Sequence, residues 1–170
     1  NAGTDWRIAI DGVANPDRFH YYAMATGVDG RLYLSGEAGL LYYSADTGQS
    51  WVRIEDLYDG SLFGSVEGED AVFAFGLRGH IFLSPDGGES WRELENDERT
   101  SLYGGVALTD GRALMVGSGG LVLAIDTEGN RQAWRHPSRA SLSSAVQAAN
   151  GDIWLVGMKG LMALSEAKPL

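Results

Sequence analysis

Short apolar runs of about four residues alternate along the chain with turns that contain glycine. A strand-like run stands before each of these turns and another after it, as in residues 32–35 and 40–43. Runs of this length bounded by glycine predict β-strands, because a helix would need a longer apolar face with a period of 3.6 residues. The turns share a pair of glycines separated by two residues, with steps of 40, 41 and 40 residues: Gly36/Gly39, Gly76/Gly79, Gly117/Gly120 and Gly157/Gly160. The pattern therefore predicts four repeats, each built on a hairpin.

Two further strands complete each predicted repeat. A strand of smaller residues precedes the hairpin, and turn signals such as Asp110-Gly111 supply the positive φ that a tight connection needs. Small side chains suit a strand that is crowded near a central axis, and these strands are residues 22–25, 63–66, 103–106 and 143–146. A fourth strand is expected to begin at Trp51 and at Trp91, with a looser version at Trp134. Each repeat is thus a four-stranded meander.

A repeated four-stranded antiparallel unit of about 40 residues is typical of a β-propeller blade. We therefore predict an all-β protein: one β-propeller domain over residues 1–170 with about four blades, either a small closed ring or part of a larger propeller. The approximate repeats are 19–57, 58–98, 99–139 and 140–170. The last repeat ends after its third strand. Residues 5–10, which resemble the strand at Trp51, either complete this blade or are the tail of a further blade.

A second motif, Ser-x-Asp-x-Gly-x-x-Trp, joins the third and fourth strands in two repeats, and an eroded copy keeps Asp126. The two full copies contain Ser44, Asp46, Gly48 and Trp51, and Ser84, Asp86, Gly88 and Trp91. An aspartate can accept hydrogen bonds from N–H groups shortly ahead of it, and glycine takes the positive φ of such a turn. A tryptophan supplies a large apolar plug between blades. We predict a structural role for these residues, because calcium needs about 6 to 8 oxygen ligands and each turn offers one carboxylate.

This motif is the Asp-box, or BNR repeat, and residues 75–91 closely resemble repeats of the photosystem II stability/assembly-factor-like family. The resemblance implies a propeller that assists the assembly or stability of a membrane complex without catalysis. Family members commonly form rings of seven blades, so four repeats are a departure from the pattern. We expect an extracytoplasmic protein, periplasmic or secreted, in a bacterium.

Candidate binding residues lie in the connections from the fourth strand to the first and from the second strand to the third, which share one face of a meander. We call it the loop face; the Asp-boxes lie on the opposite face. Loops on a rigid scaffold are the usual place for binding residues. The candidates are Arg18, Glu37, Tyr58, Arg78, Arg99, Arg135, Arg139 and Lys159. We predict that this face binds a protein partner, and that apolar end blades offer a route to a homo-oligomer.

The alternative function is a sialidase-like glycoside hydrolase or a degenerate carbohydrate-binding propeller, because related repeats occur in sialidases. Those enzymes hold their substrate with three arginines and use a Tyr–Glu pair and an aspartate. The flanking motifs of sialidases are absent, and four repeats are fewer than their six blades. Three guanidinium groups that converge beside Tyr58 and a carboxylate would favour the enzyme; a scattered distribution would favour the scaffold.

Composition excludes several further classes of function and of binding site. Thirteen Lys+Arg against 23 Asp+Glu give a formal net charge of -10, which opposes binding to nucleic acid. The absence of cysteine excludes disulfides and thiolate metal sites, and the spacing of His20, His80 and His136 does not suggest zinc. We predict no metal and no cofactor. Apolar runs of a few residues predict no transmembrane segment.

Overall fold

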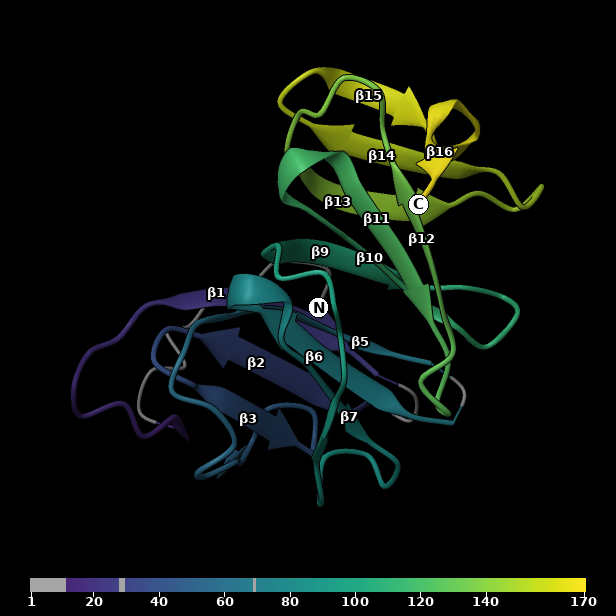
Figure 1. The fold of residues 1–170 in the computed structure, drawn as a ribbon. Helices are drawn as coiled ribbons and strands as arrows, with labels where there is room; N and C mark the ends of the chain where they lie inside the picture. The colour runs from purple at the N-terminus through teal and green to yellow at the C-terminus, as the bar shows by residue number, and fades with distance from the viewer. Residues whose placement is uncertain (1–11, 28–29, 69) are drawn as a thin grey trace, which may run out of the picture.

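The computed structural model describes residues 12–27, 30–68 and 70–170, which form antiparallel sheets that follow one another along the chain (Figure 1). The first blade contains β1 (Tyr21–Thr26), β2 (Leu32–Gly36), β3 (Leu41–Ser44) and β4 (Val52–Arg53). The second contains β5 (Leu62–Glu67), β6 (Val72–Gly76), β7 (Ile81–Ser84) and β8 (Arg92–Leu94). The third contains β9 (Leu102–Ala107), β10 (Ala113–Gly117), β11 (Leu121–Ile125) and β12 (Arg131–Arg135). The fourth contains β13 (Leu142–Gln147), β14 (Ile153–Gly157) and β15 (Gly160–Ala163).

Short segments complete the secondary structure: the 3₁₀ turns η3 (Leu77–Gly79), η4 (Ser118–Gly120) and η5 (Leu164–Glu166), and the two-residue strand β16 (Lys168–Pro169). In the described part of the chain, no helix has the length and apolar character needed to cross a membrane.

The two glycines of each repeat are required for different reasons. At Gly76, a Cβ atom would lie 2.1 Å from the carbonyl oxygen of Ser61, so the strand can approach the preceding loop only with glycine. At Gly79, φ is +77°, a left-handed conformation that glycine adopts without steric cost. The first glycine therefore lets the hairpin pack against the connection that precedes its own blade, and the second turns the chain.

The blades are arranged around an axis because their first strands lie side by side. β1 contacts β5, β5 contacts β9, and β9 contacts β13. This confirms the predicted all-β propeller of four blades. β13 has no comparable contact with β1, and the first and fourth blades lie at opposite ends of the molecule (Figure 1). The described residues thus form an open arc rather than a closed ring.

Most of the core lies between blades. Phe73 and Phe75 of β6 share a buried cluster with Met115 and Leu123 of the third blade. On the other side of the third blade, Leu114 belongs to a cluster that includes residues of β14 and β15. The second and third sheets therefore each bury one face against the blade before and one against the blade after, which is how a propeller without a single central core is held together.

The fourth blade differs from the others. Its sheet has the order β13-β14-β15 in the described residues, and the end of the chain does not add a fourth strand to it. Instead β16 pairs with β12 of the third blade, with Lys168 opposite Arg135 and Pro169 opposite Trp134. The predicted completing strand at residues 5–10 lies outside the described residues.

The prediction that Trp134 begins a fourth strand is wrong. β12 begins at Arg131, and Trp134 lies within it opposite Val122. The physical reason is that the turn at Asp126 closes on Asn130, four residues ahead, just as the turn at Asp46 closes on Ser50. No insertion is present, so Arg131 occupies the position that Trp51 and Trp91 have in the first two blades.

Candidate functional site

The turn that Asp46 closes in the first blade is a network of hydrogen bonds within the turn itself. The N–H groups of Gln49 and Ser50 donate to Asp46 Oδ1 at 3.0 and 2.8 Å, and the Ser50 hydroxyl donates to Oδ2 at 2.6 Å. Ser44 Oγ donates to Asp46 Oδ1 at 2.8 Å and accepts from Gly48 N–H at 2.8 Å. The carboxylate is therefore used to fasten its own turn.

The second blade repeats this network and adds the tryptophan. Asp86 accepts from Ser84 Oγ at 2.8 Å and from the N–H of Ser90 at 2.8 Å, while Trp91 Nε1 donates to the carbonyl of Gly88 at 3.0 Å. The Trp91 ring packs against the cluster that Leu41 of β3 forms with residues of the second blade. The indole thus covers the seam between two blades.

Hydrogen bonds to the charged carboxylate lower its pKa, because they favour the ionised form. The hydroxyl of Ser50 is the largest cause at Asp46 and the hydroxyl of Ser90 at Asp86, and each pKa is lowered from 3.8 to about 2. The pKa of Asp126 is lowered too, chiefly by the side chain of Asn130. None of these acids is held protonated for use as a general acid at neutral pH.

On the loop face, two predicted residues line the same cavity. Arg78 of η3 and Arg99, from the connection between the second and third blades, border a volume of about 380 Å³ together with His80 and acids of residues 93–97. In the described part of the chain, neither guanidinium has an ion-pair partner. Both side chains belong to exposed residues. We call this the rim cavity.

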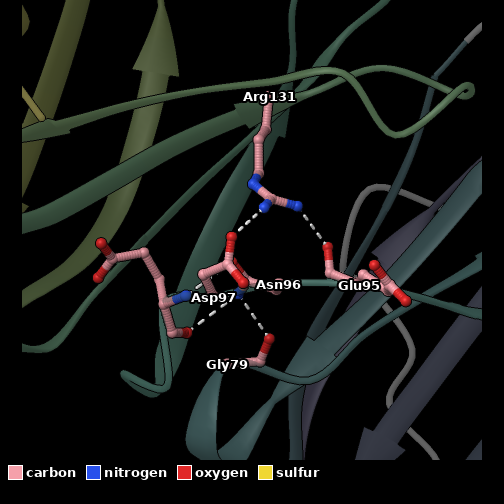
Figure 2. Close-up of polar contacts among 6 residues, drawn as sticks. Gly79, Glu95, Asn96, Asp97 and Arg131 are labelled. Carbon is pink, nitrogen blue, oxygen red and sulfur yellow. Dashed lines mark hydrogen bonds and ion pairs between the residues drawn. The ribbon is translucent and has the colours of Figure 1, made fainter.

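The wall of the rim cavity is fixed by polar contacts from residues of the second and third blades (Figure 2). Asn96 Nδ2 donates to the carbonyls of Gly79 at 2.8 Å and Glu98 at 3.0 Å. Arg131 donates to the carbonyl of Glu95 at 2.8 Å and forms an ion pair with Asp97. The arginine that replaces tryptophan in the third blade therefore ties down the connection from the second.

Tyr58 lies beside this cavity. Its ring lies against His80 with a centroid distance of 4.5 Å and a tilt of 34° between the planes, and His80 Nδ1 lies 2.6 Å from Glu93 Oε1. The Tyr58 hydroxyl donates to the carbonyl of Leu77 at 3.3 Å. Burial raises the pKa of Tyr58, so the phenol stays protonated and holds η3 rather than acting as a nucleophile at neutral pH.

The remaining candidates are dispersed over the loop face. Arg135 forms an ion pair with Glu98 at 2.9 Å. Glu37 accepts from the backbone N–H and the ring of His20, which lowers its pKa. Arg18 and Arg139 lie at positive φ in loops, and Lys159 is exposed between β14 and β15.

The three-arginine pattern of a sialidase is not formed by these side chains. Two of the candidate guanidiniums line the rim cavity, a third is paired with Glu98, and the other two lie in separate loops. Among the residues that the structure describes, no group of three His, Asp or Glu is placed to hold a metal ion.

Sequence reasoning missed a feature at the centre of the loop face. Each first strand of a blade contains a register shift at its start, so that one residue falls outside the ladder. These four bulged residues are Tyr22, Phe63, Tyr103 and Ser143. Their spacing of 41, 40 and 40 residues could have revealed them. The strands that contain them were instead predicted from their small residues.

The rings of the three bulged aromatic residues form a row. Tyr22 lies 5.3 Å from Phe63, and Phe63 lies 5.4 Å from Tyr103, measured between ring centroids. We call these three residues the aromatic row. It continues into a groove of about 530 Å³ whose walls come mainly from β1, β5 and β9, which we call the axial groove.

Blades that stack radially around an axis through their inner strands define the class: the protein is a β-propeller. The family described as outer membrane protein assembly factor BamB matches residues 78–168, more than half of the chain. The chain belongs to this family. No curated protein sequence matches it.

Solved propellers share the fold. Virginiamycin B lyase from Staphylococcus aureus superposes with a TM-score of 0.77 at 19% identity, over 89% of this chain and 54% of that one. YCF48 from Cyanidioschyzon merolae gives a TM-score of 0.70 at 19% identity, over 89% of this chain and 55% of that one. YCF48 bound to D1 peptide gives 0.61 at 16% identity, over 85% and 48%. The chain thus spans about half the length of these propellers.

Proposed function

We propose that this protein is a non-catalytic interaction scaffold that presents its loop face to a protein partner and assists the assembly or stability of a membrane complex. The observation that carries the proposal is that polar and charged side chains hold a connection of the loop face in place. The side chains of Asn96, Arg131 and Arg135 fasten the connection between the second and third blades. A fastened loop is a preorganised surface, which lowers the entropy lost when a partner binds.

The same arrangement speaks against a glycoside hydrolase. A retaining or inverting mechanism needs two carboxyl groups that face one substrate, one of them free to donate a proton. Asp97 pairs with Arg131, Glu98 with Arg135 and Glu93 with His80. Turnover of any substrate in a panel of fluorogenic glycosides would contradict the non-catalytic function.

Two comparisons support a protein partner. The family is described by an assembly factor of the outer membrane, and one propeller of similar shape is bound to a peptide. The family also supports our proposal of an extracytoplasmic location in a bacterium, which fractionation of the source cells tests.

The absence of cysteine allows each face to be masked separately. Arg78→Cys places a single thiol on the loop face, and Glu89→Cys places one in an Asp-box turn on the opposite face; both positions are exposed. Each variant is coupled to maleimide-polyethylene glycol, and peptides enriched from a displayed random decapeptide library on the unmodified protein are titrated against it.

We expect the polymer at residue 78 to weaken binding at least tenfold, because it covers the loop face, and the polymer at residue 89 to leave it within about twofold. The reverse order, or a library from which nothing is enriched, contradicts the proposed function. Uncoupled variants serve as controls for the substitutions themselves.

A further inference from the structure

The fourth blade, at the end of the arc, has an apolar face that looks away from the third blade (Figure 1). Leu155 and Met162 point the other way and are buried in the cluster shared with the third blade. Residues paired across antiparallel strands point to the same side of the sheet. The register of β13, β14 and β15 therefore gathers one set of residues on the outer side, which we call the end face: Ser144, Val146, Trp154, Val156, Leu161 and Ala163. None of them is charged.

The end face is exposed in the described part of the chain. After β15 the chain turns back through η5, and β16 pairs with β12 of the third blade. Trp154 and Val156 are 39% and 44% exposed at the positions where the second blade has Phe73 and Phe75, which the following blade buries. Of the eleven large apolar residues that are exposed among the described residues, six lie in residues 141–170. A concentration of this kind marks an interaction surface.

The charge of the chain is distributed so that the end face can meet a copy of itself. Residues 141–170 contain two acids and two lysines, so the whole formal net charge of -10 lies in the rest of the chain. Two copies that approach through their first three blades bring net negative charge together, whereas two fourth blades do not. The first blade is a poor partner for the end face, because Val13 and Phe19 already pack on its outer side. These observations favour an isologous contact between two end faces, with two-fold symmetry.

Two charged residues near the ends of β14 set the orientation of such a contact. Asp152 stands just before β14 and Lys159 just after it, in the turn to β15. Both are exposed, and neither forms an ion pair within the residues that the structure describes. With the two β14 strands parallel, each charge would lie beside its own copy and repel it. With the strands antiparallel, Asp152 of each copy lies beside Lys159 of the other, which gives two attractive pairs by symmetry.

We propose that a second copy of the chain covers the end face, with the two fourth blades packed face to face and their β14 strands antiparallel. The two loop faces then lie on opposite sides of the dimer and stay open to partners. Three strands of about five residues span roughly 14 by 17 Å. This patch is smaller than the ~800 Å² of accessible surface per partner in a stable interface, so the dimer is weak and dissociates on dilution. Trp154 is therefore exposed at the low protein concentrations of an unfolding experiment.

Sedimentation equilibrium between about 1 and 300 µM protein covers the range in which a small interface associates. The mass should rise with concentration from one chain of 18.2 kDa toward two. Val156→Lys buries an unpaired charge in the contact and should raise the dissociation constant at least tenfold. Val52→Lys is the matched control, because Val52 is a valine of 49% exposure on β4 of the first blade and the change in net charge is the same. It should change the constant less than about twofold.

Charge reversal tests the orientation. Asp152→Lys and Lys159→Asp each turn two attractive pairs into repulsive ones, so each should raise the dissociation constant about tenfold. An equal mixture of the two variants restores opposite charges at both contacts and should associate as tightly as the wild type. Asp152→Lys also reduces the net negative charge of the chain, so an effect of net charge alone would strengthen the dimer instead.

A mass that stays at one chain at every concentration overturns this inference, as does a dimer that Val156→Lys leaves unchanged. A dimer that Val156→Lys breaks but that neither charge reversal weakens overturns the antiparallel arrangement. Urea unfolding shows whether each variant is folded, and Leu161→Lys is a second variant on the end face, at a residue of 66% exposure. The loop face takes no part in the contact, so each of these outcomes leaves the proposed function standing.

Discussion

The second and fourth blades share one repeat but differ in what covers the face that looks toward the next blade. In the second blade, Phe73 and Phe75 are 0% and 1% exposed because the third blade lies against them. The equivalent residues of the fourth blade, Trp154 and Val156, are 39% and 44% exposed. The same strand position is thus core in one blade and surface in the other, and the neighbouring blade makes the difference.

The first blade shows a third solution to the same problem. Its face away from the second blade carries Leu34 and Tyr42, which are buried with Val13 and Phe19 packed against them. The Tyr42 hydroxyl also donates to the carbonyl of Ala14 at 2.5 Å. An irregular segment can therefore cover an end blade, and among the described residues the fourth blade has no such cover.

The largest difference between the two blades is expected from truncating equivalent residues. Phe73→Ala should lower the free energy of unfolding by about 3 to 5 kcal/mol, because it leaves a cavity between two blades. Trp154→Ala should lower it by no more than about 1 kcal/mol, as is usual for a partly exposed site. Urea denaturation of both variants measures the contrast.

Equal losses would break the comparison, because they would mean that the face of the fourth blade is covered in solution. Light scattering on the wild-type protein then shows whether a second copy of the chain provides this cover. A mass of two chains identifies a second copy as the cover, as the prediction of a homo-oligomer through end blades requires.

A smaller contrast is expected from the turn after the third strand. Asp86 closes this turn in the second blade, whereas Glu166, at the corresponding place of the fourth, lies in η5 and 3.3 Å from His136 Nε2. Asp86→Ala should cost about 1 to 2 kcal/mol, since it leaves several donors without their acceptor. Glu166→Ala should cost less than about 1 kcal/mol, because the Glu166 side chain is 59% exposed and solvent screens its contact with the buried His136. Thermal unfolding of both variants gives the order, and a larger loss for Glu166→Ala would contradict it.

The smallest expected effect is on the pH dependence of stability. Asp46 and Asp86 have a pKa of about 2 in the folded chain against an ordinary 3.8, so the unfolded chain binds protons first as pH falls. Their contribution is therefore complete above about pH 4 and is lost as pH falls toward 2. Both groups are exposed to solvent, which keeps the effect small.

Urea midpoints of the wild type and of Asp86→Asn between pH 4.5 and 2 check the sign. The difference between the two proteins should shrink as pH falls. A difference that stays constant over this range would show that the Asp86 charge does not support the turn.

Much of the architecture could be predicted because it depends on signals between residues that are close together in the sequence. The glycine pairs and the alternation of apolar runs located the four hairpins, since positive φ and close backbone approach select glycine wherever they occur. The turns at Asp46 and Asp86 could be predicted equally well, because the groups that hydrogen-bond within each turn lie within four residues of one another. The error at Trp134 arose where a local motif had lost its tryptophan and a later one stood nearby in sequence.

The sequence by itself determined the repeat, the blade and the turns that Asp46 and Asp86 close, because each depends on interactions between residues close together along the chain. Only the tertiary structure decided which apolar faces are buried, that Arg131 holds the connection of the preceding blade, and that the bulges at Tyr22, Phe63 and Tyr103 meet in one row. These depend on how whole sheets stack around an axis, and residues 40 apart become neighbours only when that stacking is complete.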